Sequence, residues 1–197
     1  MILGDMCTIR SGMTLRSRLA EAPDGLLTVQ QGDISPRGEF DRENASRMST
    51  PASSSHLVAP GELVVRSRGP FWSAWAPSDL DEPVAAIAPL FILTPAPDID
   101  PAYLAWFIGR PAAQRYFATE SMGTSVKMIP RDVLGRLPIT APPIEQQRTI
   151  ATAAALSEHE HRLSARLSDL RHTLNSAHLD QYSRRAAAAS DTDRTTR

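Results

Sequence analysis

The feature that most constrains this chain is a stretch without glycine or proline, which runs from Ile144 to Tyr182. Alanine, leucine, arginine, glutamate and glutamine dominate the stretch, and all of them favour helix. It predicts one continuous helix of about 39 residues, roughly 58 Å long at 1.5 Å per residue. We assign residues 143–183 to this long helix and residues 184–197 to a disordered tail.

Leucines recur along the predicted helix at alternating spacings of three and four residues, with Glu160 filling one position of the series. This spacing is typical of a coiled-coil seam. The predicted seam residues are Leu156, Leu163, Leu167, Leu170 and Leu174. A domain of about 140 residues is too small to cover a helix of this length, so we expect a partner chain, most simply a second copy. The alternative is a helix that folds back along its own domain.

Residues 1–142 differ in composition from the helix, because they contain every tryptophan, phenylalanine and glycine of the chain. They predict a globular domain of short strands, turns and a few helices, and therefore an α+β fold with a mixed sheet. The expected strands are Leu26–Gln30, Glu62–Arg68 and a buried one over Val84–Leu93. A surface loop is expected over Asn44–His56. The expected helices run from Asp100-Pro101 to Gly109 and from Pro111 to Phe117.

The charges balance almost completely, with 21 basic and 22 acidic residues. Residues 1–140 alone hold 13 basic and 15 acidic side chains, so binding to a polyanion has to rely on a local patch. Lys127 is the single lysine, and the other basic residues are arginines. Arginine forms bidentate hydrogen bonds with phosphates and guanine edges. A GC-rich genome, whose codons favour arginine, is the alternative explanation.

Cellular location is constrained by the lone Cys7, which forbids an intrachain disulfide and favours a reducing cytoplasm. The start of the chain, Met1-Ile2-Leu3-Gly4-Asp5, has neither the basic nor the apolar region of a signal peptide. The longest apolar run, Val84–Leu93, is far shorter than the roughly 18 to 20 residues of a membrane span. We expect a cytoplasmic protein that does not contact a membrane.

Several enzyme signatures are missing from the sequence. It contains no phosphate-binding loop, no G-x-S-x-G serine motif and no lysine placed for a metal-dependent nuclease. The turn Ala141-Pro142-Pro143-Ile144 lacks the polar and aromatic residues of an amino-methyltransferase site. The histidines of the long helix form no i, i+4 pair and have no cysteine beside them, so we expect no metal site. We predict no catalytic residues and no cofactor bound by this chain.

The segment Leu137-Pro138-Ile139, followed by Pro142-Pro143-Ile144-Glu145-Gln146-Gln147, closes the globular domain and opens the helix. It resembles the end of a target-recognition domain in the DNA specificity subunits of type I restriction-modification systems. Other segments resemble the same family in the same order, from residue 3 to about residue 180. They are Leu3-Gly4-Asp5 to Ser11-Gly12, Gly61 to Gly69, Asp100 to Phe117, Met122-Gly123-Thr124 and Ile129 to Leu137.

The chain departs from this family in size, because the usual subunit carries two recognition domains and two long helices. A half-size form with a single target-recognition domain is therefore expected to pair, with its two helices antiparallel. The resemblance implies a non-catalytic subunit in which each domain reads one half of a split double-stranded DNA target. The paired helices would act as the spacer between the halves and as the docking platform for DNA methyltransferase subunits.

The resemblance also implies the other partners of the complex. The methyltransferase subunits would bind S-adenosylmethionine and methylate adenine, and a motor-nuclease subunit would cut. The second half of the reader is either another copy of this chain or a different half-subunit. Two identical readers related by a two-fold axis predict a palindromic split target. The acidic balance of the domain predicts weak DNA binding by the chain alone, strengthened by the methyltransferase subunits.

Candidate DNA contacts are polar side chains on the predicted strands and in loops. Arg66 and Arg68 alternate along one strand beside Gly69, and small polar residues that follow Gly123 suit phosphate contacts. Gln30 could pair with adenine. The complete set of candidates is Arg10, Thr14, Arg16, Arg18, Gln30, Arg66, Arg68, Thr124, Ser125 and Lys127. The alternative for each of these side chains is that it is exposed to solvent or stabilises the fold without contacting DNA.

Two other functions compete with DNA specificity. One is a coiled-coil adaptor whose globular domain binds protein, which would show no salt-dependent DNA binding. The other is a detached recognition domain of a fused restriction-methylation enzyme. The start at Met1, without a trace of an upstream domain, favours the specificity subunit over this last function.

Overall fold

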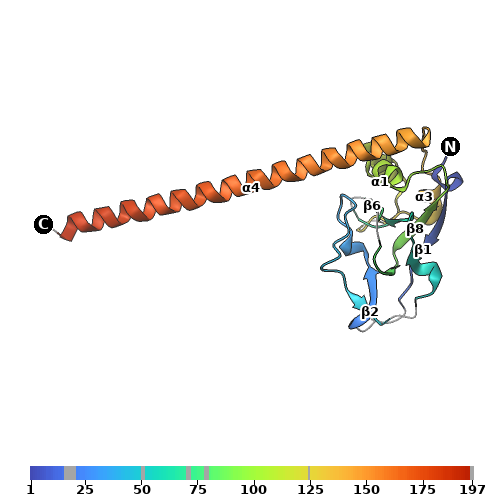
Figure 1. Ribbon diagram of the computed structural model, residues 1–197, viewed down its shortest axis with the longest axis horizontal. Coiled ribbons are helices and arrows are strands. Elements are labelled where there is room, and N and C mark those ends of the chain that lie inside the picture. The colour runs from blue at the N-terminus through green and yellow to red at the C-terminus, as the bar shows by residue number, and fades with distance from the viewer. Residues whose placement is uncertain (16–20, 50–51, 70–71, 78–79, 124, 196–197) are drawn as a thin grey trace. The chain divides into compact units, whose positions relative to one another are not determined.

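The computed structural model describes the backbone of residues 1–15, 21–49, 52–69, 72–77, 80–123 and 125–195, and the side chains of these residues as far as residue 183 (Figure 1). The chain divides into two compact units, Met1–Ala151 and Thr152–Arg197. The first unit contains the strands and the short helices, and the second is the continuation of one long helix. This is the α+β class that the composition predicts.

The first unit alternates short strands with short helices before the long helix begins. Its strands are β1 Cys7–Ser11, β2 Glu21–Val29, β3 Arg47–Met48, β4 Leu57–Val58, β5 Leu63–Arg66, β6 Ala74–Trp75, β7 Val84–Ala86 and β8 Leu90–Pro95. Its helices are the 3-10 turns η1 Leu3–Asp5, η2 Gln31–Asp33 and η3 Ser54–His56, followed by α1 Pro101–Gly109, α2 Pro111–Glu120, α3 Arg131–Gly135 and the start of α4 Ile144–Thr195.

The strands form two four-stranded sheets that pack face to face. The first has the order β1-β8-β5-β6 and is antiparallel, and the second has the order β3-β2-β7-β4 and contains one parallel pair, β2 with β7. Because side chains alternate along a strand, β5 sends Leu63 and Val65 to one face of the first sheet and Val64 to the other. The first sheet is therefore buried on both faces.

Helices α1, α2 and α3 cover the outer face of the first sheet and share a core with it. Helix α1 begins as predicted, because the Asp100 carboxylate accepts a hydrogen bond from the Tyr103 backbone N–H at 2.9 Å and Pro101 occupies the first turn. Tyr103, Leu104 and Ile108 bury the apolar face of this helix. The predicted pair of short helices is confirmed, and the second helix continues to Glu120.

Several sequence-based boundaries of the strands and loops differ from the structure. The single strand predicted over Val84–Leu93 is wrong; it is two strands, β7 and β8, which lie in different sheets. Pro89 lies between them, and a residue without a backbone N–H cannot continue a strand ladder. The strand predicted over Leu26–Gln30 is β2, which begins at Glu21 and ends at Val29, and the strand predicted over Glu62–Arg68 is β5, which covers only Leu63–Arg66. The loop expected over Asn44–His56 contains β3 and η3, which the abundance of serine and proline concealed.

The beginning of α4 is fixed to the globular domain by a buried glutamine. Gln147 is 1% exposed. Its Oε1 accepts from the Asp100 backbone N–H at 2.9 Å, and its Nε2 donates to the carbonyls of Pro142 and Asp98 at 2.7 and 3.0 Å. The amide thus connects the Pro142-Pro143 turn, the first turns of α4 and the entry into α1. This role explains the glutamine at position 147 of the Glu145-Gln146-Gln147 segment in structural terms.

The remainder of α4 forms the second unit. Its helical backbone continues to Thr195, past residue 183, the predicted end of the helix. Residues 183–195 contain no glycine or proline and include four consecutive alanines, so nothing in the sequence interrupts the helix there. No helix of the described residues is both long enough and apolar enough to cross a membrane.

Candidate nucleic-acid interface

Three segments distant in sequence meet where β5 ends. The Gly69 backbone N–H donates to the Lys127 carbonyl at 3.0 Å, and Arg68 forms an isolated β-bridge with Met128. The side-chain amide of Gln31, in η2, donates to the Arg68 carbonyl at 2.9 Å. These contacts hold together η2, the end of β5 and a hairpin that is closed by the pairing of Met122 with Met128. We call the set Gln31, Arg66, Arg68, Ser125 and Lys127 the β5-end cluster.

The hairpin of this cluster depends on a glycine. Met122 and Met128 exchange two backbone hydrogen bonds of 2.8 and 2.9 Å, which close the hairpin. Gly123 has φ +105°, and a Cβ at this position would lie 2.5 Å from the Val126 carbonyl oxygen. An L side chain is strained in this conformation. Ser125 and Lys127 are therefore presented on an exposed loop whose backbone shape requires glycine.

The basic side chains of the β5-end cluster are not neutralised by acids. No described carboxylate forms an ion pair with Arg66, Arg68 or Lys127. The Nζ of Lys127 donates to the Ala118 carbonyl at 3.1 Å, and the Nε of Arg68 lies 3.4 Å from the Met128 sulfur. Arg68 and Lys127 are exposed, so the rest of their donors face solvent.

Arg66 is half-buried and points from β5 toward the second sheet, on the same face as Val64. Its Nε and the Oε1 of Gln31 are buried atoms without a hydrogen-bond partner among the described residues. Burial lowers the pKa of the Arg66 guanidinium, which still carries its charge because arginine does not deprotonate in proteins. Gln31 was not among the sequence-based candidates, and nothing in the sequence distinguishes it from Gln30.

Thr14 and Gln30 lie in segments that reach the same end of the domain. The Ala88 backbone N–H donates to the Met13 carbonyl and the Ile87 N–H to the Val29 carbonyl, both at 2.9 Å. The hydroxyl of Ser67 donates to the Pro89 carbonyl. The residues that follow Met13 and Val29 are therefore tied to the turn between β7 and β8, and through Ser67 to the end of β5. The structure brings Thr14, Gln30 and the β5-end cluster to one edge.

Arg10 does not join this edge. Its five guanidinium N–H groups donate to Glu62, Thr94 and the carbonyls of Ser55 and Leu57, with bonds of 2.5 to 2.9 Å. The side chain of Glu62 is only 7% exposed. Arg10 therefore has no donor left for a phosphate in this arrangement, and it connects β1 to the segment that contains η3 and β4. Glu62 was missed as its partner, because no short-range spacing relates the two residues.

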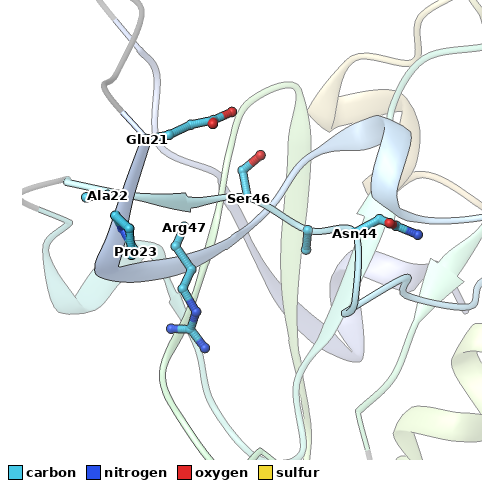
Figure 2. Close-up of a pocket in the computed structure, with 7 residues that line it drawn as sticks. Glu21, Ala22, Pro23, Asn44, Ser46 and Arg47 are labelled. Carbon is cyan, nitrogen blue, oxygen red and sulfur yellow. The ribbon is translucent and has the colours of Figure 1, made fainter.

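A depression of about 460 Å³ lies between the start of β2 and residues 44–47 (Figure 2). Glu21 and Arg47 point in different directions from its rim, as Figure 2 shows. Arg47 donates to Glu82 at 2.7 Å, and Arg42 pairs with the same carboxylate and with Asp81. Hydrogen bonds from these two arginines lower the pKa of Glu82. Arg42 and Arg47 therefore contribute little uncompensated positive charge.

Three of the predicted DNA contacts, Arg16, Arg18 and Thr124, lie outside the described residues. The described residues contain no group of three or more histidines, cysteines or acids that could hold a metal ion. The Cys7 thiol is buried, which raises its pKa to about 11, and it donates to the Leu3 carbonyl at 3.2 Å. A protonated and buried thiol is a poor nucleophile.

Comparison of sequences identifies no relative, because no model of a known protein family and no curated protein matches the chain. Comparison of structures identifies similar proteins. The chain is similar to the HsdS subunit from Thermoanaerobacter tengcongensis, with a TM-score of 0.57 and 21% identity over 84% of this chain. It is also similar to the type I restriction-modification S subunit from M. genitalium, with a TM-score of 0.55 and 14% identity over 81% of this chain.

A third similar chain comes from work on complex assembly and conformational transition of the type I restriction-modification system, with a TM-score of 0.58 and 20% identity over 83% of this chain. The match spans 38% of the length of each of these three chains. This agrees with the half-size form predicted from the sequence. The chain therefore has the fold of one part of a type I restriction-modification specificity subunit, a globular α+β domain followed by one long helix.

Proposed function

We propose that this chain is a DNA specificity subunit of a type I-like restriction-modification system. Its globular domain reads one half of a split double-stranded target. Its long helix pairs with a second helix, which separates the two readers and provides a docking platform for DNA methyltransferase subunits. The chain itself carries out no catalysis, and the methyl donor S-adenosylmethionine is bound by those partner subunits.

The observation that carries this proposal is the uncompensated positive charge of the β5-end cluster. The domain has more acidic than basic side chains, so a polyanion can bind only where the local balance is reversed. Arg10, Arg42 and Arg47 are engaged with carboxylates, whereas Arg68 and Lys127 offer exposed donors. Exposed guanidinium and ammonium groups beside side-chain amides suit phosphate oxygens and base edges.

Self-pairing determines the symmetry of the target. Two copies of one reader, related by a two-fold axis, contact two identical half-sites in opposite orientation. We therefore propose a palindromic target interrupted by a spacer of constant length. The excess of acidic over basic side chains in the domain implies weak binding by the chain alone, strengthened by methyltransferase subunits. A motor-nuclease subunit is the further partner expected for restriction.

A coiled-coil adaptor that binds only protein is the second candidate function. The leucines exposed along α4 favour it, because they provide an interaction surface without any need for DNA. The two functions differ in their response to salt. Binding to DNA phosphates weakens steeply as the salt concentration rises, and an adaptor has no such binding to lose.

The test is fluorescence anisotropy of labelled double-stranded DNA, titrated with the chain and a methyltransferase subunit at several salt concentrations. We expect a linear fall of log affinity with log salt. Arg68→Ala and Lys127→Ala should each weaken binding and reduce the magnitude of the slope by about 0.9 if each loses one phosphate contact. Arg136→Ala is the matched control, because Arg136 pairs with Asp132 on α3, away from the cluster. Equal effects of all three variants would contradict the assigned interface.

A further inference from the structure

The leucine seam of α4 lies fully within the second unit and is exposed. The five leucines are 48% to 65% exposed: Leu156, Leu163, Leu167, Leu170 and Leu174. Large apolar side chains in one stripe at this spacing are stabilised by burial against another helix. No described residue of the chain covers them. The order of the side chains along the stripe restricts how a second helix can lie against it.

The stripe is symmetric about Ala165 at every position except that of Leu170, whose counterpart is Glu160. Leu163 and Leu167 lie equally far from Ala165 on opposite sides, as do Leu156 and Leu174. Beyond them, Ala153 and Ala177 are also placed symmetrically. A sequence with this symmetry fits a second copy that runs in the opposite direction. Leu163 then packs against Leu167 of the second copy, and Leu156 packs against its Leu174.

Glu160 breaks the apolar series and distinguishes the possible directions. In a parallel pair in register, Glu160 would face Glu160 of the second copy, and like charges at one level of a seam repel. In the antiparallel pair, the symmetry places Glu160 opposite Leu170 of the second copy, beside its Arg171. Opposite charges at this position attract, and the stem of arginine covers apolar surface while its charged end reaches outward.

Both charges lack a partner within their own helix. Neither Glu160 nor Arg171 forms an ion pair among the described residues, and neither has a residue of opposite charge three or four positions away. They are eleven residues apart, about 16 Å along one helix at 1.5 Å per residue, too far to meet each other. A second copy in the antiparallel register pairs both of them twice, once on each side of the two-fold axis.

We propose that α4 pairs with α4 of a second copy in an antiparallel register centred on Ala165, and that Glu160 and Arg171 of opposite copies fix this register. The proposal depends on the self-pairing in the proposed function but not on DNA recognition. The seam leucines supply the affinity, and the two charge pairs select the direction and alignment. The occupant of the exposed stripe is therefore the same stripe of a second chain.

The test is charge reversal in the full-length chain, with the dimer dissociation constant measured by sedimentation equilibrium. Glu160→Arg places two arginines together, and Arg171→Glu places two glutamates together. Because each change acts at two sites of the dimer, we expect each variant to weaken dimerisation by about tenfold or more. The double variant Glu160→Arg/Arg171→Glu restores opposite charges and should return to within about threefold of the unchanged chain.

A mixture of the two single variants provides an independent measurement. In the antiparallel register, a Glu160→Arg chain and an Arg171→Glu chain complement each other at both sites, so the mixture should form heterodimers tighter than either homodimer. Asp169→Arg is the matched control, because Asp169 lies on the outward face and should leave dimerisation unchanged. Circular dichroism verifies that each variant keeps its helix.

Each outcome bears on the proposal differently. Weakened single variants without recovery in the double variant would overturn the antiparallel register, because in a parallel pair residues 160 and 171 do not meet. Single variants that dimerise like the unchanged chain would overturn the role of Glu160 and Arg171 but leave self-pairing intact. A monomeric unchanged chain would overturn both this inference and the self-pairing in the proposed function.

Discussion

Arg10 and the buried Glu62 form a bidentate ion pair, with Nη2 of Arg10 2.6 Å from Oε2 of Glu62 and Nη1 on the other carboxylate oxygen. Thr94 donates to the same carboxylate at 2.6 Å, and the Ala59 backbone N–H donates at 2.8 Å. The pair joins β1 and β8 to the start of β5. Arg10, one of the predicted DNA contacts, therefore has a structural role in this arrangement.

The first prediction concerns the dependence of stability on pH. Burial by itself raises the pKa of Glu62, but hydrogen bonds from Arg10, Thr94 and Ala59 outweigh burial and hold the pKa below its ordinary value of 4.5. A group with a depressed pKa stabilises the folded chain above its unfolded pKa, and this stabilisation is lost as the pH falls through the folded pKa. Glu62→Gln should therefore cost about 1–3 kcal/mol at pH 7 and less in acid. Urea unfolding of both chains at pH 7 and in acid measures this cost. An equal loss of unfolding free energy under the two conditions would contradict the prediction.

The second prediction concerns the anchor of the long helix. Gln147→Ala removes a buried amide that serves three backbone groups, and it should lower the free energy of unfolding of the globular domain by about 1–3 kcal/mol. Gln146→Ala is the matched control, because Gln146 is the same residue type one position earlier and is exposed. Chemical unfolding followed by tryptophan fluorescence measures both. A similar cost for the two variants would show that Gln147 has no special role.

The longer helices could be predicted from the sequence because their signals are local. The run without glycine or proline identifies α4, and Asp100-Pro101 with Gly109 delimits α1. The two sheets could not be predicted, because β3, β4 and β6 are two residues long and depend on pairing with distant segments. The division of Val84–Leu93 between two sheets is likewise a property of tertiary packing.

The candidate site was predictable in part. Arg66, Arg68 and Lys127 were identified from residue type and from their place beside glycines, and the structure puts them on one edge. The structural engagement of Arg10 was not predictable, because its partner lies 52 residues away. Gln31 was missed for a similar reason, since its distinguishing feature is a hydrogen bond to the carbonyl of Arg68, 37 residues away.

The third prediction concerns the hairpin that presents Lys127. Gly123→Ala forces an L side chain to adopt φ +105° against the Val126 carbonyl, so the hairpin has to change shape. We expect weaker DNA binding with a small loss of stability, about 1 kcal/mol. Gly109→Ala is the control, because a Cβ at Gly109 meets no atom within 4 Å and Gly109 ends α1, outside the β5-end cluster. Anisotropy and thermal unfolding of both variants test this; unchanged DNA binding by Gly123→Ala would exclude the hairpin from the interface.

The fourth prediction concerns the seam. Leu167→Asp places a charge at the centre of the proposed helix pair and should abolish dimerisation, because an isolated buried carboxylate is strongly unfavourable. Ser168→Asp adds the same charge one position further, where it points away from the seam, and should leave the dimer intact. Light scattering gives the mass of each variant. A dimeric Leu167→Asp chain would refute the seam.

Selection of binding sites from random double-stranded DNA measures directly whether a pair of these chains reads a split target. The purified chain is used together with a methyltransferase subunit, and the bound DNA is sequenced after several rounds. We expect two identical half-sites in inverted orientation with a spacer of constant length, and we expect this enrichment to be lost when Arg68 and Lys127 are replaced by alanine. Two unlike half-sites would contradict pairing of identical chains, and no enriched sequence would contradict DNA recognition itself.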